Sequence, residues 1–196
     1  MSPMQITIVV VAAVVLVGLV LAGWYLWRHQ SLRRRFGPEY GRLAKQEGRI
    51  AADRELRERQ RRHDKLELHP LDEETRQRYS AAWTALQTNF VDSPEETIGA
   101  TEELVNQLAA ERGYPTGDYD EQVAQLSVDH ARTLGHYRAA HDTYLRHQQG
   151  EAETEELRQA LVHYRDLFAD LLGEDPVARA NGNPDRTHQT EDVIKP

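Results

Sequence analysis

The hydrophobic residues of this 196-residue chain form one continuous run near the N-terminus and spaced patterns after it. The run, from Ile6 to Leu26, contains twenty-one residues and no charge. A helix rises about 1.5 Å per residue, so the run would span roughly 30 Å, which matches the hydrocarbon core of a bilayer. The pattern predicts a transmembrane helix over residues 6–27, after a short N-terminus of residues 1–5.

Beyond the run, apolar residues recur at intervals of three and four, which indicates amphipathic helices. Residues 28–67 are polar almost all round, so they predict a single stalk helix supported by charge pairs four residues apart. Residues 68–173 predict an antiparallel bundle of about four helices joined by short turns. Residues 174–196 contain few apolar side chains and predict a disordered tail. The expected fold class is all-α.

Capping residues set the expected helix ends within the bundle. Ser93 and Glu96 have the spacing of a capping box around a helix start, and Asp118 and Glu121 have the same spacing. From Asp118 to Gly150 the apolar positions fit one long helix of about thirty residues, or roughly 45 Å.

Aromatic and basic side chains close the apolar run, whereas the five residues before it contain no Lys or Arg. Trp and Tyr prefer the headgroup level of a bilayer, and basic residues favour its cytoplasmic side. We therefore expect a single-pass protein of the cell membrane, with its N-terminus outside and its C-terminal domain in the cytoplasm. The expected membrane-interface residues are Trp24, Tyr25, Trp27, Arg28, Arg33, Arg34 and Arg35.

A cleaved signal peptide is the alternative explanation of the run, with a small-residue cleavage site at residues 20–22. The run is longer than the roughly 7–15 residues of a secretory core, and no basic region precedes it, so a retained anchor is favoured. Gly18 and Ala22 also have the spacing of small residues in membrane helix dimers, which leaves a homodimer open.

Charge divides the rest of the chain. Residues 28–62 contain twelve basic and five acidic residues, and residues 63–196 contain twelve basic and twenty-seven acidic residues. Each basic residue close to an anionic leaflet gains about 1 kcal/mol, so anionic lipid headgroups near the stalk are expected partners. The acidic body argues against nucleic acid as a partner, because phosphate contacts need a basic surface.

A short motif, Arg35-Phe36-Gly37-Pro38-Glu39-Tyr40, follows the basic cluster. Gly37 is expected to end one helix and Pro38 to begin the next, and Phe36 and Tyr40 have a spacing like that of a hydrophobic staple. Together with residues 112–115, 126–130, 137–138 and 164–168, the motif resembles a family of uncharacterised single-span actinobacterial membrane proteins. The resemblance implies the architecture and no activity, cofactor or site. Some members are labelled secreted, so an extracytoplasmic body stays open.

The sequence contains no recognisable pattern for catalysis or metal binding. His130 and His141 are eleven residues apart on one expected helix, roughly 16 Å, so they cannot share one ion. No His in the body follows a Glu by three residues as in di-iron bundles, no His-Glu-x-x-His motif occurs, and Cys is absent. We expect no cofactor, no metal site and no catalytic residue, and a protein that is not an enzyme.

Polar residues on the apolar faces of the last two expected helices predict a buried polar layer, which more often fixes helix register than performs catalysis. Its candidate members are Asp129, His130, Tyr137, His141 and Tyr164. The leading hypothesis is a membrane-anchored interaction or scaffold protein with an unidentified protein partner. The alternative is a small-ligand or metal-binding sensor bundle, which would need a polar cavity lined by His130, Tyr137, His141 and Tyr164.

Overall fold

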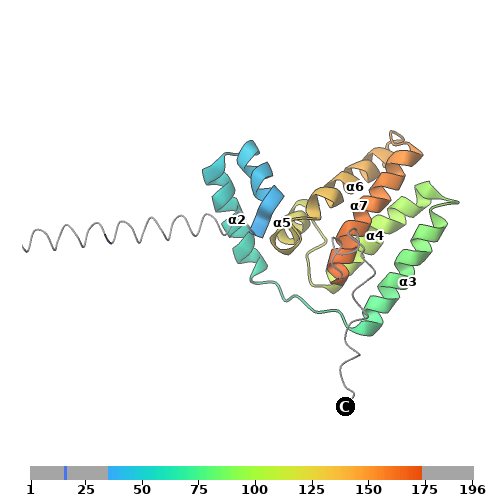
Figure 1. The fold of residues 1–196 in the computed structure, drawn as a ribbon, viewed down its shortest axis with the longest axis horizontal. Helices are drawn as coiled ribbons and strands as arrows, with labels where there is room; N and C mark the ends of the chain where they lie inside the picture. The colour runs from blue at the N-terminus through green and yellow to red at the C-terminus, as the bar shows by residue number, and fades with distance from the viewer. Residues whose placement is uncertain (1–15, 17–34, 174–196) are drawn as a thin grey trace, which may run out of the picture. The chain divides into compact units, whose positions relative to one another are not determined.

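The computed structural model describes residue 16 and residues 35–173. Every regular element in this part of the chain is a helix, which confirms the all-α class, and none of these helices is long and apolar enough to cross a membrane. Apart from Leu16, the predicted span and the predicted tail lie outside the described residues. The helices are residues 35–46, α2 (Arg49–His63), α3 (Glu73–Asn89), α4 (Pro94–Glu111), α5 (Tyr119–Asp129), α6 (Leu134–Gln148) and α7 (Thr154–Leu172) (Figure 1).

Two compact units interleave along the chain. Within the described residues, unit 1 consists of residues 35–68 and 113–135, and unit 2 consists of residues 69–112 and 136–173. Among the described residues, unit 1 contains the helix of residues 35–46, α2 and α5, and unit 2 contains α3, α4, α7 and nearly all of α6. Each unit is therefore assembled from segments that are distant in sequence.

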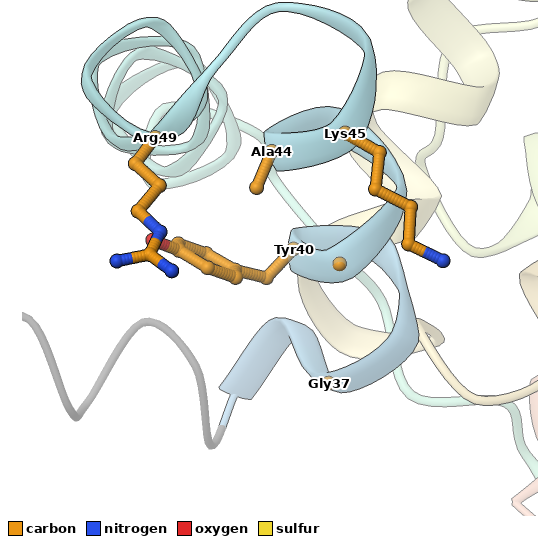
Figure 2. A pocket seen from close by; sticks show the side chains of 6 residues that line it. Gly37, Tyr40, Ala44, Lys45 and Arg49 are labelled. Atoms are coloured by element: carbon orange, nitrogen blue, oxygen red, sulfur yellow. The ribbon is translucent and has the colours of Figure 1, made fainter.

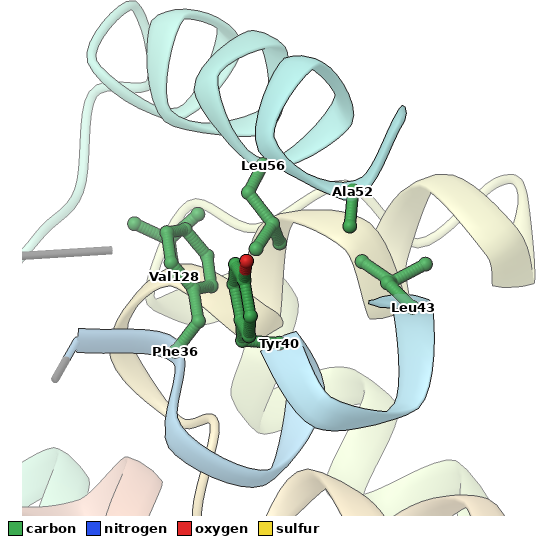
Figure 3. Close-up of a cluster of buried hydrophobic side chains, with 6 residues drawn as sticks. All are labelled: Phe36, Tyr40, Leu43, Ala52, Leu56 and Val128. Carbon is green, nitrogen blue, oxygen red and sulfur yellow. The ribbon is translucent and has the colours of Figure 1, made fainter. Parts of the chain in front are cut away.

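The prediction of a single stalk helix is wrong, because the described part of that segment forms two helices. The helix of residues 35–46 stops before Gly48, whose φ of +86° is a left-handed conformation that glycine adopts readily, and α2 begins at Arg49 (Figure 2). The apolar sides of both helices pack against α5 instead of facing solvent (Figure 3). The resulting core of unit 1 contains Phe36, Tyr40, Leu43, Ala52, Leu56 and Val128.

The predicted charge pairs of α2 are present. Arg59 lies 2.8 Å from Glu55, and the pairs of Arg62 with Glu58 and of Arg57 with Asp53 measure 3.4 and 3.7 Å. In each pair the acidic residue precedes the basic one by four positions, as the helix geometry requires for contact.

The prediction of one long helix from Asp118 to Gly150 is also wrong. α5 ends at Asp129, His130 takes φ −114° and ψ 29°, and α6 begins at Leu134. The backbone N–H and the hydroxyl of Thr133 both donate to the carbonyl oxygen of His130, at 3.2 Å each. No glycine or proline marks this break, and every residue from 122 to 128 is buried, so packing within unit 1 decides it.

Unit 2 is a helical bundle in which α4 packs against both α3 and α7. The ring of Trp83 on α3 stacks on Phe168 of α7, with the ring centroids 4.6 Å apart. Tyr137 of α6 and Tyr164 of α7 are completely buried. The periodic apolar positions that predicted these helices therefore form the interior of the bundle.

Of the two predicted helix caps, the one at the start of α5 is present and the one at the start of α4 is not. The side chain of Asp118 accepts a hydrogen bond of 2.9 Å from the N–H of Glu121, as predicted. Ser93 precedes Pro94 at the start of α4, but its side chain makes no capping hydrogen bond, so the predicted capping box is wrong. Its ψ of 70° departs from the extended backbone of an ordinary N-cap residue, and its carbonyl oxygen accepts from the N–H of Thr97.

Candidate functional site

A buried carboxylate lies at the centre of the polar contacts of unit 2. Glu102 of α4 is 7% exposed. Its Oε1 is 3.0 Å from Nδ1 of His141 on α6, and its Oε2 accepts a hydrogen bond from the hydroxyl of Tyr164 on α7. The hydroxyl of Tyr137 on α6 lies 3.5 Å from Oε1 of Glu102 and 3.2 Å from Oδ1 of Asn106 on α4. Side chains of three helices therefore meet at one carboxylate.

The hydrogen bonds to Glu102 compensate for the cost of burying its carboxylate. Removing an ionised carboxylate from water carries a penalty of several kcal/mol unless hydrogen bonds or an opposite charge compensate it. Hydroxyl and imidazole N–H groups supply those bonds to Glu102, and the rings of Tyr137 and Tyr164 meet edge to face, 6.0 Å between centroids. The cluster can fix the register of α6 and α7 against α4, as buried polar networks do.

The structure brings together three of the five residues of the predicted polar layer. Tyr137, His141 and Tyr164 share Glu102, whereas Asp129 and His130 belong to unit 1. Sequence reasoning missed Glu102, although a signal was present: an acidic residue stands four positions after Ile98, inside the apolar stripe of α4.

Asp129 and His130 take part in a second polar cluster, in unit 1. Asp129 lies 3.1 Å from the guanidinium of Arg35 and 3.0 Å from Nε2 of His63. The hydroxyl of Tyr114 is 3.5 Å from Asp129 and 3.1 Å from Nε2 of His130. The cluster therefore connects the first residue of the helix 35–46 with α2, with the end of α5 and with the loop that precedes α5.

The residues of the Arg-Phe-Gly-Pro-Glu-Tyr motif have separate structural positions in unit 1. Phe36 and Tyr40, four residues apart, both lie in its core (Figure 3). Gly37 has φ +40°, a left-handed conformation, but the helix of residues 35–46 continues through Gly37 and Pro38, so the prediction that one helix ends and the next begins there is wrong. Glu39 is buried, whereas Pro38 is exposed. The motif thus places an apolar pair and a carboxylate on the side of this helix that packs against α2 and α5.

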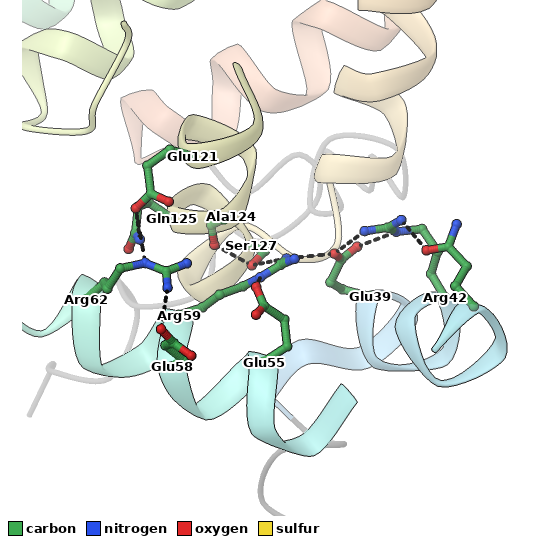
Figure 4. A network of polar contacts seen from close by, with 11 residues as sticks. Glu39, Arg42, Glu55, Glu58, Arg59, Arg62, Glu121, Ala124, Gln125 and Ser127 are labelled. Atoms are coloured by element: carbon green, nitrogen blue, oxygen red, sulfur yellow. Dashed lines mark hydrogen bonds and ion pairs between the residues drawn. The ribbon is translucent and has the colours of Figure 1, made fainter. Parts of the chain in front are cut away.

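Glu39 anchors an ion-pair network between the helix 35–46, α2 and α5 (Figure 4). Its Oε1 lies 2.8 Å from Arg42 and 3.0 Å from Arg59 of α2. Arg59, whose side chain is 10% exposed, also contacts Glu55 at 2.8 Å and donates to the hydroxyl of Ser127 on α5 at 3.4 Å. A buried, hydrogen-bonded pair of this kind is costly to break one partner at a time.

A third polar cluster lies on the surface of unit 2. Nδ1 of His136 is 2.5 Å from Asp166, and the imidazoles of His136 and His163 stack with centroids 4.9 Å apart. Burial, and next the neighbouring His136, lower the pKa of His163, while Asp166 acts in the opposite direction. His163 therefore resists protonation in the folded bundle more than it does in an unfolded chain.

Among the predicted membrane-interface residues, only Arg35 belongs to the described part of the chain. Its guanidinium contacts Asp129 and the backbone carbonyl of Val128. Within residues 35–173, no group of three or more His, Cys, Asp or Glu side chains is placed to hold a metal ion.

The sequence matches no model of a known protein family, and it shows no significant similarity to a curated protein or to a solved structure.

Proposed function

We propose that this protein is a membrane-anchored, non-enzymatic interaction or scaffold protein, which presents its helical body to a protein partner at the cytoplasmic face. The uncharged run from Ile6 to Leu26 carries the proposal, because it has the length of a bilayer core and is followed by aromatic and then basic residues. Glu39 of the motif, and Asp129, Tyr137, His141 and Tyr164 of the predicted polar layer, all contact other residues within their own unit. Their placement favours structural roles in a binding module.

Charge supports a partner with a basic surface. The described part of unit 1 contains eleven acidic and eleven basic residues, so the basic stretch is balanced within its own unit. The described part of unit 2 contains sixteen acidic and seven basic residues, a net charge of −9. An acidic body of this kind accelerates association with basic partners and discriminates against acidic ones.

The sensor alternative requires His130, Tyr137, His141 and Tyr164 to line one polar cavity. Instead, Tyr137, His141 and Tyr164 direct polar atoms at Glu102, and His130 contacts Tyr114 in unit 1. These contacts support the interaction protein over the sensor.

Membrane fractionation combined with a topology reporter tests the anchor. The full chain, fused after Pro196 to a reporter that is active only in the cytoplasm, is expected to stay in the membrane pellet after alkaline carbonate extraction and to show reporter activity. Replacing Val14 and Leu16 in the run by Arg should release the chain from the pellet, because each buried charge costs about 3 kcal/mol at the bilayer centre. A wild-type chain in the soluble fraction, or an inactive reporter in the membrane fraction, would contradict the proposal.

The partner is tested by photo-crosslinking in cells. A photoreactive residue at exposed positions of unit 2, such as Glu95 and Glu103, is expected to give a discrete crosslinked protein. Changing Glu95, Glu96 and Glu103 together to Gln should reduce the yield, because rim charges govern association. An unchanged crosslinking yield in this variant would contradict the proposal that the acidic surface of unit 2 attracts the partner.

A further inference from the structure

Unit 1 contains a solvent-open hollow of about 440 Å³ beside the turn between the helix 35–46 and α2. Gly37, Tyr40, Gly41, Ala44, Lys45 and Arg49 line it. Figure 2 shows the side chain of Arg49 extending beside the ring of Tyr40, with Lys45 on the other side of Ala44 in this view. The volume lies within the range of small-molecule sites in proteins, about 300–1,000 Å³.

The two basic residues of the hollow differ from the basic residues that surround the core. Arg42 pairs with Glu39, Arg59 with Glu39 and Glu55, and Arg57 with Asp53. Lys45 and Arg49 are exposed and form no ion pair with any residue that the structure describes. Among the described residues, these two cations therefore differ from Arg42, Arg57 and Arg59 in having no carboxylate partner.

None of the described residues that line the hollow is acidic. Glu47 lies between them in sequence but does not line the hollow, and the first turn of α2 contains no acidic residue. The hollow adjoins both the C-terminal turn of the helix 35–46 and the start of α2, whose dipole ends have opposite signs, so the charges of Lys45 and Arg49 dominate the local potential. The electrostatics therefore favour an anion.

The shape and chemistry of the lining favour a phosphate group attached to something larger. A guanidinium can bind two phosphate oxygens at once, and an ammonium adds a compact charge. Ala44 and the edge of the largely buried Tyr40 line the hollow next to these cations. Inorganic phosphate would leave most of a volume of about 440 Å³ unfilled, whereas a lipid headgroup would occupy more of it.

Chain length places the hollow close to the membrane if the proposed anchor is correct. Gly37 follows Leu26 by eleven residues. Eleven residues span at most about 40 Å when fully extended and about 17 Å as a helix. A headgroup at the bilayer surface is therefore within reach, and its phosphate is the anion present there at the highest concentration.

We propose that this hollow binds the phosphate-bearing headgroup of an anionic phospholipid through Lys45 and Arg49. The proposal rests on the proposed membrane anchor and adds a defined lipid site to it. It assigns a second membrane attachment to the turn between the first two described helices.

Native mass spectrometry of the full chain in detergent micelles tests this site with phosphatidylglycerol as the probe and phosphatidylcholine as the neutral comparison. The wild type is expected to retain phosphatidylglycerol preferentially. Because each basic residue near an anionic lipid contributes about a fivefold effect, Lys45→Gln with Arg49→Gln should weaken retention roughly 25-fold. Arg54→Gln with Arg61→Gln removes the same charge from exposed positions of α2 outside the hollow, and should leave retention unchanged.

A third variant fills the hollow without changing its charge. Gly41 lies in the helix 35–46, and a Cβ at this position would meet no atom within 4 Å. Gly41→Leu should therefore keep the fold, checked by helical circular dichroism, and should abolish selective retention of phosphatidylglycerol.

Several results would overturn the lipid site. They are equal losses in the two charge variants, wild-type retention by Gly41→Leu, and displacement of the lipid by inorganic phosphate at comparable concentration, which would assign the hollow to free phosphate. The micelle measurement does not depend on insertion in cells. Failure of the anchor in the fractionation experiment is therefore distinguishable from failure of the site.

Discussion

At the scale of single residues, Glu39 shows how a short motif acts through burial. Its carboxylate is 2% exposed and serves two arginines, of which Arg59 is almost as deeply buried and Arg42 is 38% exposed. Exposed ion pairs contribute at most about 1 kcal/mol, whereas leaving one member of a buried pair alone costs several times more. The two arginines are therefore unequal partners of the same carboxylate.

Glu39→Gln is expected to lower the free energy of unfolding by about 3 kcal/mol, because the charge of Arg59 stays buried with only Glu55 to balance it. Urea denaturation followed by circular dichroism measures this change. Arg42→Gln is the control and should cost less than about 1 kcal/mol. Equal losses in the two variants would show that burial does not set the strength of the network.

The pKa of His163 gives unit 2 a predictable pH dependence. Burial, followed by His136, lowers this pKa in the folded state, so the unfolded state binds the proton more readily. The contribution of His163 to stability is present above the ordinary histidine pKa of about 6.5 and is lost as the pH falls below it.

His163→Gln should therefore lose less thermal stability than the wild type between about pH 7.5 and about pH 5.5. Differential scanning calorimetry at both pH values measures the two differences in Tm. His69, which is exposed and belongs to unit 2, offers a control: His69→Gln should follow the wild type. An identical pH response of wild type and His163→Gln would contradict the assignment.

At the scale of elements, backbone conformation decides how helices are joined. Gly113 follows α4 with φ +94°, and a Cβ on it would lie 2.3 Å from the carbonyl oxygen of Glu67. Both the left-handed angle and the contact exclude other residues there. The turn after α4 and the segment after α2 can approach each other only because this residue lacks a side chain.

Gly113→Ala should lower the free energy of unfolding by at least about 2 kcal/mol, since it adds a backbone clash to the cost of a left-handed angle. Gly117→Ala, four residues later, meets no atom within 4 Å and has no positive φ, so it should change stability by less than about 1 kcal/mol. Denaturant unfolding of both variants provides the comparison. A mild effect at Gly113 would mean that Glu67 moves aside.

At the scale of the whole molecule, the segments that form the two units alternate along the chain. α5 belongs to unit 1, with residues 35–68, although it lies in sequence between helices of unit 2. Its residues 122–128 are all buried. A chain that begins at residue 69 would keep α5 but lose the two helices that contribute Phe36 and Leu56 to the core with Val128.

A fragment of residues 35–173 should therefore unfold cooperatively, whereas a fragment of residues 69–173 should expose the apolar surface of α5. Binding of a hydrophobic dye and thermal unfolding by circular dichroism distinguish the two. The longer fragment is expected to bind little dye and the shorter one to bind it strongly. Equal dye binding would show that α5 does not need the two preceding helices.

Periodicity and caps in the sequence predicted most helices of the body, because these signals are local. The stripes through Trp83, Val105 and Tyr164 correspond to helices α3, α4 and α7, and Asp118 caps α5 as expected. Membership of the polar cluster was partly predicted, since Tyr137, His141 and Tyr164 do converge. Their shared partner Glu102 lies on another helix, and helical spacing alone does not show which side chains meet across helices.

The sequence by itself determined the all-α class, helices α3, α4 and α7, and the charge pairs along α2, and it predicts a membrane anchor, because each of these depends on residues within a few turns of one another. The tertiary structure decided three other features: the fold of the expected stalk onto α5, the break between α5 and α6, and the division of the predicted polar layer between the two units. These features depend on contacts between distant segments, such as Phe36 with Val128 and Arg59 with Ser127. Burial against such partners outweighs local helix propensity, which is worth less than about 1 kcal/mol per residue.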